Sequence, residues 1–209
     1  MWIRSSLILS LLLAACSKTS SDTSRYHEDG RAKPVVAICS MIDVTSFDCA
    51  WSLSEEFTSM IAQNLSKNGS IFVGKSEDLG FTENPFGTDL AWMKREFPDQ
   101  EFAVFMELVE HQLVPTSKPR PGATEVSMNL NMGVRLRVVD LRPATPKLVL
   151  QEMVRNSYYI PKTLIPTDYN IAVWGTDEFR RSPMGVAHIQ LVDEIVSRLN
   201  DYILLAKSR

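Results

Sequence analysis

The fold class of this chain is decided by the stretch Val126-Ser127-Met128-Asn129-Leu130-Asn131-Met132-Gly133-Val134-Arg135-Leu136-Arg137-Val138. Every second residue in it is apolar, whereas the residues between them are polar or glycine. Successive side chains of a β-strand point to opposite faces of a sheet, so this alternation predicts a long strand with one face on the core. The other face, which includes Arg135 and Arg137, is predicted to meet solvent; the alternative is a polar ligand-binding face.

The flanking sequence predicts four more strands and three helices. The strands follow from apolar runs at residues 35–41, 71–73, 102–113 and 148–160. The helices follow from apolar residues at helical spacing behind capping residues, at 53–65, 88–97 and 183–203. We expect the first three strands to be mostly parallel and the last two antiparallel. The predicted fold class is α/β, a mixed five-stranded sheet with about three helices packed on it.

The N-terminus has the features of an export signal. One positive charge, on Arg4, precedes an apolar run over residues 7–15 that is too short for a membrane span of roughly 20 residues. The run ends in Leu13-Ala14-Ala15-Cys16, which resembles the lipobox of bacterial lipoproteins, in which the cysteine thiol accepts a diacylglycerol before cleavage. We therefore predict a signal peptide over residues 1–15 and Cys16 as the lipidated first residue, anchored in a membrane by its acyl chains. The alternative is a plain signal peptide with an accidental cysteine.

The sequence after Cys16 divides into a tether and one domain. Residues 17–33 are polar and rich in hydroxyl groups, so we expect residues 16–33 to form a flexible tether of about 20–25 Å. Residues 34–209 are predicted to form a single α/β domain. Ser17 replaces the aspartate that usually signals inner-membrane retention in such lipoproteins, which favours the periplasmic side of the outer membrane over the inner membrane.

Composition and motifs argue against several classes of partner and cofactor. A formal net charge of -3 provides no basic excess to neutralise phosphates, so nucleic acid is not expected as a partner. His111 and His188 stand apart in the sequence and predict no metal site. Residues 69–76 match the phosphate-loop pattern, but their first glycine follows a helix and their middle is a predicted strand, so no nucleotide and no cofactor is expected.

Two cysteines remain in the predicted domain. Cys39 lies on the first predicted strand and Cys49 in the loop before the first helix. Export would place both in an oxidising compartment, where ten residues of intervening chain could bring the two thiols together as a disulfide. The alternative is a pair of buried free thiols.

Residues 161–181 form a connection longer than the roughly 12–15 residues usual in a compact domain. Tyr169 and Trp174 within it combine large rings with polar groups, which are enriched at contact sites, so they are candidate partner-contact residues. The alternative is that the loop folds back over the sheet and buries Trp174.

The domain also resembles a known family. Residues 35–38, 53–65, 68–74 and 101–108 are similar to the start of CsgG/LpoB-type periplasmic lipoprotein domains, which are related in fold to the N-terminal domain of TolB, and to an uncharacterised lipoprotein family of intracellular bacteria. The resemblance implies a lipoprotein that assembles a secretion channel or activates an envelope enzyme, and it brings no catalytic residues. We therefore expect a non-enzymatic envelope lipoprotein that acts through contacts with an unidentified protein. The alternatives are a subunit of an outer-membrane secretion pore and, least favoured, an envelope hydrolase.

Overall fold

The computed structural model describes residues 24–74, 83–116 and 126–209. Its strands are β1 (Val35–Ile38), β2 (Ile42–Asp43), β3 (Phe72–Val73), β4 (Phe102–Pro115), β5 (Met128–Asp140) and β6 (Lys147–Ile160). Its helices are α1 (Leu53–Lys67), α2 (Met93–Glu96), α3 (Asp177–Arg181) and α4 (Pro183–Lys207), with a 3-10 turn, η1, at Lys162–Leu164. The mixed α/β class predicted from the sequence is confirmed.

The sheet has the strand order β3-β1-β4-β5-β6, and β2 adds to the edge of β4. β1 runs parallel to β3 and β4, whereas β4, β5 and β6 are antiparallel neighbours, as the sequence predicted. The predicted first strand is divided in two, however. Ile38 pairs with Val104 and Ile42 with Glu107, so four steps along this strand match three along β4, and the chain bulges between β1 and β2.

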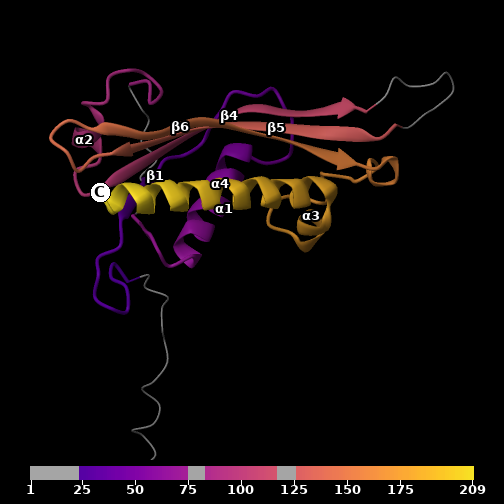
Figure 1. The fold of residues 1–209 in the computed structure, drawn as a ribbon. Helices are drawn as coiled ribbons and strands as arrows, with labels where there is room; N and C mark the ends of the chain where they lie inside the picture. Colours follow the sequence, from indigo (N-terminus) through magenta and orange to yellow (C-terminus); the bar gives the residue numbers. More distant parts are fainter. Residues whose placement is uncertain (1–23, 75–82, 117–125) are drawn as a thin grey trace, which may run out of the picture.

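The main core lies between one face of the sheet and the helices α1 and α4, which Figure 1 shows beneath the strands. Ser52 Oγ accepts the backbone N–H of Glu55 at the start of α1, and Ser182 Oγ accepts that of Gly185 at the start of α4. These caps confirm the predicted helix starts. A β-carbon on Gly185 would lie within 2 Å of the Phe179 carbonyl oxygen (1.9 Å), so α3 packs against α4 closely enough to require glycine.

The opposite face of the sheet is partly covered, which corrects the predicted solvent face. Residues 86–97 pack a second apolar cluster on it, centred on Trp92, Met93 and Phe97. Arg137 is buried there and donates hydrogen bonds to the backbone carbonyls of residues 85–87 and to Gln151. These contacts hold residues 85–87 over the sheet. The predicted helix over 88–97 is reduced to the single turn α2.

The chain enters and leaves the domain at the same end of the sheet. β1 begins there, β5 ends there, β6 begins there and α4 ends there. Residues 24–33 form a turn at this end, closed by a bridge between Tyr26 and Ala32, and Arg25 lies over the Phe72 ring, 5.0 Å from its centroid. We call this end the tether end. The opposite end, which holds residues 161–182 and the start of α4, is the loop end (Figure 1).

Candidate functional site

The long connection at the loop end is folded, not extended. It contains η1 and α3, and Phe179 of α3 is buried in the main core. The two predicted contact residues, Tyr169 and Trp174, are half-buried and pack against that core. The Tyr169 hydroxyl accepts the backbone N–H of Met184 at 3.4 Å. Both aromatic rings therefore point largely inward. This agrees with the alternative interpretation, in which the loop folds back over the domain.

Two other side chains of this loop are presented to solvent. Leu164 is 48% exposed and Ile171 is 69% exposed, the highest value among the large apolar residues of the described chain. Together they line a cavity of about 510 Å³ with Ala172 and Pro183. Asp168, Glu178 and Arg181 are the charged residues of its lining. The sequence predicts contact residues in this loop, but it points to the aromatic ones, because periodicity cannot show which apolar side chains of an irregular segment face outward.

A chain of buried polar side chains lies beneath this end of the domain. The Trp51 indole N–H donates to Glu56 Oε2 at 2.7 Å, and Glu56 Oε1 lies 2.7 Å from His188 Nδ1. His188 Nε2 lies 2.8 Å from His111 Nε2. The side chains of Glu56 and His188 are fully buried. These hydrogen bonds connect α1, α4 and β4, whose residues are far apart in the sequence.

The protons in this chain can be ordered in two directions. If His188 Nε2 carries no proton, it accepts from His111 Nε2–H; if His188 Nε2 carries a proton, it donates to His111 Nε2. His111 Nδ1 lacks a hydrogen-bond partner among the described residues in either case. Burial, together with the charge of His188, lowers the pKa of His111 to about 3. His111 is therefore neutral in the folded protein at ordinary pH.

Aromatic rings enclose the histidines and connect them to the loop end. Phe47 meets the His111 ring edge-on at 4.2 Å between centroids, and Phe179 meets His188 at 5.7 Å. Trp51 in turn packs edge-on against Phe179 at 5.0 Å. The buried chain thus supports α3 from below. The sequence does not reveal it because residues in direct contact, such as Glu56 and His188, are as many as 132 positions apart and only the tertiary packing brings them together.

The predicted disulfide between Cys39 and Cys49 is not formed in this structure, where both are free thiols. Cys39 belongs to the apolar cluster on the far face of the sheet, whereas Cys49 packs against the main core. The two side chains therefore lie on different faces of the sheet. Burial raises the pKa of the Cys39 thiol, and the Cys49 thiol donates to the Trp51 carbonyl at 3.0 Å. Cys16 and the Lys75-Ser76 end of the phosphate-loop match lie outside the described residues.

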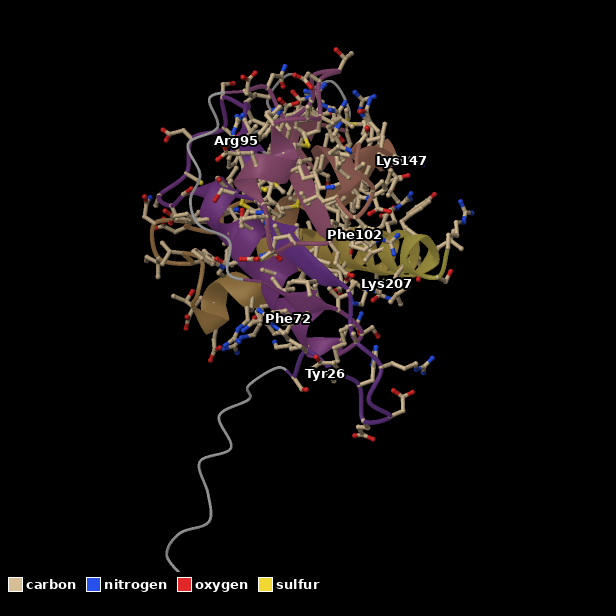
Figure 2. All side chains as sticks on the ribbon, turned by 90° about the vertical axis from the view of Figure 1, so that its left-hand side faces the viewer. Tyr26, Phe72, Arg95, Phe102, Lys147 and Lys207 are labelled. Atoms are coloured by element: carbon tan, nitrogen blue, oxygen red, sulfur yellow. The ribbon has the colours of Figure 1, made fainter. Side chains whose placement is uncertain are left out.

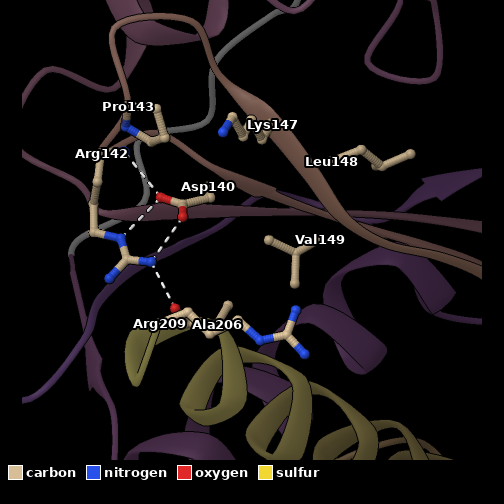
Figure 3. A pocket seen from close by; sticks show the side chains of 8 residues that line it. All are labelled: Asp140, Arg142, Pro143, Lys147, Leu148, Val149, Ala206 and Arg209. Carbon is tan, nitrogen blue, oxygen red and sulfur yellow. Dashed lines mark hydrogen bonds and ion pairs between the residues drawn. The ribbon is translucent and has the colours of Figure 1, made fainter.

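A second cavity, of about 560 Å³, lies at the tether end (Figure 3). Arg142 crosses it, pairing with both carboxylate oxygens of Asp140 and donating to the Ala206 carbonyl at 2.7 Å. This pairing with Asp140 raises the pKa of Arg142. Lys147 and Arg209 also line the cavity, but their side chains form no hydrogen bond or ion pair with another described residue.

The described residues contain no group of three or more acidic, histidine or cysteine side chains placed to hold a metal ion. In the same part of the chain, no helix has both the length and the apolar character needed to cross a membrane. The candidate site is the loop-end surface around Leu164 and Ile171, where exposed apolar side chains line a cavity. The buried Glu56–His188–His111 chain lies beneath it.

Comparison with solved structures shows the fold. The hypothetical protein CT253 from Chlamydia trachomatis aligns with a TM-score of 0.68 and 23% identity, over 82% of this chain and 98% of that one. The lipoprotein GNA1162 from Neisseria meningitidis aligns with a TM-score of 0.41 and 10% identity, over 78% of this chain and 99% of that one. The second score is too low to bear on function. No curated protein matches the sequence.

A family model covers most of the chain. It is described as a family of unknown function, DUF7499, and it matches residues 22–207, which include every described strand and helix. The predicted resemblance to CsgG/LpoB-type domains is met at the level of fold only, and none of the families named in that resemblance is confirmed. The chain belongs to the DUF7499 family.

Proposed function

We propose that this protein is a lipid-anchored bacterial envelope lipoprotein that works without chemistry of its own, by holding another envelope protein at its loop end. The anchor is supported by Leu13-Ala14-Ala15-Cys16, in which every lipobox position is met. Ser17 favours the periplasmic side of the outer membrane. The CsgG/LpoB-type resemblance supports a role in assembling or activating an envelope machine.

The observation that supports the contact site is the exposed apolar pair at the loop end. An exposed Ile171 beside a cavity leaves apolar surface in water that a partner could cover. The backbone around it is held firmly: Asp168 Oδ1 accepts the N–H of Asn170, and the Asp168 carbonyl accepts those of Ile171 and Ala172. A rigid apolar projection loses little conformational entropy on binding, which suits a docking site.

Fatty-acid labelling tests the anchor. Cells that produce the full chain should incorporate a labelled acyl chain into it, and the protein should partition with membranes. Cys16→Ser should abolish both, because the thiol is the acceptor. Ser17→Ala serves as the control and should keep both. Labelling of the Cys16→Ser chain equal to that of the wild type would show that the lipobox assignment is wrong.

Site-specific photo-crosslinking in cells tests the contact. A photoreactive amino acid in place of Ile171 should give a discrete crosslinked species, identified by mass spectrometry. The same group in place of Val44, which is 56% exposed but lies outside the loop, is the matched control and should not give that species. Equal crosslinking from both positions would place the contact elsewhere. A crosslink to a second copy of this chain would identify self-assembly as the contact.

A further inference from the structure

The charged side chains of the domain are segregated along its length. The segments that build the tether end are residues 24–34, 67–72, 94–101, 140–147 and 207–209. They contain ten lysine or arginine residues and six acidic ones. The rest of the described chain contains seven basic and fifteen acidic residues. A protein with a negative formal charge therefore has one positive end.

The cations of this end belong to several elements, and some of them lie around the β5–β6 turn. Lys94 donates to the Pro143 carbonyl at 2.6 Å, and Arg142 bonds the carbonyls that end α4. Figure 2 looks directly onto this end, with Arg95, Lys147 and Lys207 on the facing surface. The side chains of Lys147 and Arg209 make no hydrogen bond or ion pair with another described residue, and Lys147 acts only electrostatically on Asp140, so both can contact an external anion.

Apolar side chains are exposed beside these cations. Leu148 is 49% exposed and lines the same cavity as Lys147. Leu205, on the last turns of α4, is 51% exposed, and Tyr26 of the entry turn is 59% exposed. A surface that mixes cations with exposed leucine and tyrosine has the composition of a membrane-interface surface, where phosphate groups lie above acyl chains.

The position of the entry turn brings this end close to the predicted anchor. Residues 24–33 are packed on the domain through Arg25 and Phe72, so only the chain from Cys16 to Ser24 separates the acyl chains from the fold. Eight residues span at most about 28 Å when fully extended. The cationic end is thus held within reach of lipid headgroups, whereas the loop end lies a whole strand length away.

We propose that the tether end is a membrane-facing surface that binds the anionic headgroups of phospholipids, with Lys147 and Arg209 contacting their phosphates. This inference rests on the proposed lipid anchor and adds an orientation to it. In this orientation the strands run away from the membrane surface. The part of the domain with an excess of acidic residues points away from the bilayer, and the Leu164–Ile171 surface faces the periplasm. Each basic side chain near an anionic bilayer strengthens binding, and the attraction decays within about 10 Å at moderate salt.

Lysine labelling of the full lipidated protein in vesicles tests this orientation. Lys147 and Lys162 are both exposed and lie near opposite ends of β6, roughly 40 Å apart at the rise of a β-strand. Vesicles are made of phosphatidylcholine alone or with phosphatidylglycerol added. We expect amine modification of Lys147 to slow about fivefold in the anionic vesicles and to recover at high salt. Modification of Lys162 should be the same in both.

Charge reversal distinguishes headgroup binding from simple crowding by the bilayer. Lys147→Glu combined with Arg209→Glu should remove the protection of Lys94, which lies at the same end. Lys162→Glu with Arg180→Glu, an equal change in charge at the loop end, should leave that protection intact. Equal modification of Lys147 in both kinds of vesicle, for protein that floats with both, would overturn the orientation while leaving the anchor standing. Protein that floats with neither kind would overturn the anchor, and the orientation with it.

Discussion

The two ends of the domain hold an acidic side chain against a basic one at different degrees of burial. At the tether end, Asp140 and Arg142 pair in a partly buried position, with 12% and 30% of their side chains exposed. At the loop end, Glu56 and His188 pair with both side chains fully enclosed. Water can replace a lost partner at the first pair but cannot reach the second. Loss of one partner should therefore reduce the stability of the fold more at the loop end than at the tether end.

Glu56→Ala should have the largest effect on stability. It removes the acceptor of the Trp51 indole and the partner of His188 Nδ1, and leaves both buried without replacement. We expect the free energy of unfolding to fall by about 3–5 kcal/mol, measured by urea denaturation. Glu55→Ala changes the adjacent, exposed carboxylate and is the control. Equal losses from the two variants would mean that the buried chain adds nothing specific.

Acidification should weaken the loop end through His111. The unfolded chain binds a proton at this residue near pH 6.5, whereas in the folded protein the pKa is lowered to about 3 by burial and by the neighbouring His188. The contribution of neutral His111 to the free energy of unfolding is thus complete above pH 6.5, and it is lost as the pH falls toward 3. Between these limits the free energy of unfolding should decline by up to about 1.4 kcal/mol per pH unit from this group.

Comparison with His111→Phe isolates that contribution. Phenylalanine cannot titrate, so unfolding free energies measured at pH 7 and pH 5 should differ less in this variant than in the wild type. His27→Phe, in the entry turn at the other end, is the control and should keep the wild-type difference. An unchanged pH dependence in His111→Phe would show that His111 does not account for it.

Arg142→Ala should have a smaller effect at the tether end. It removes the pair with Asp140 and the hydrogen bonds to the last carbonyls of α4, all of which solvent can replace. We expect a loss of about 1 kcal/mol in unfolding free energy. Hydrogen exchange should show faster opening confined to the last turn of α4. A loss as large as that of Glu56→Ala would contradict the contrast between the two ends.

Ile171→Ser should change stability least. The side chain is mostly in water in the folded domain, so the melting temperature should stay within about 1–2 °C of the wild type, since surface changes usually alter stability by under 0.5 kcal/mol. Crosslinking of the partner from a neighbouring loop position should weaken. Trp174→Ala, which removes a ring packed on the core, should lower the melting temperature by several degrees and so separates a contact role from a structural one.

The sequence by itself determined the elements whose evidence is local. The alternation over 126–138 predicted β5, the Ser52 and Ser182 caps predicted α1 and α4, and the alternation of early strands with helices predicted the parallel pairing. Strand periodicity, capping and connection length depend on residues a few positions apart, so each is visible in one dimension.

Only the tertiary structure decided what depends on distant residues. The sequence predicted that Arg137 faces solvent, but residues 85–87 cover it in the structure. Cys39 and Cys49 are close in sequence, but they lie on different faces of the sheet. His111 and His188 looked isolated because 77 residues separate them, and the packing of α4 on β4 joins them in a buried chain. The segregation of charge likewise arises where five separate segments meet, because the charge of a surface is the sum over neighbours in space.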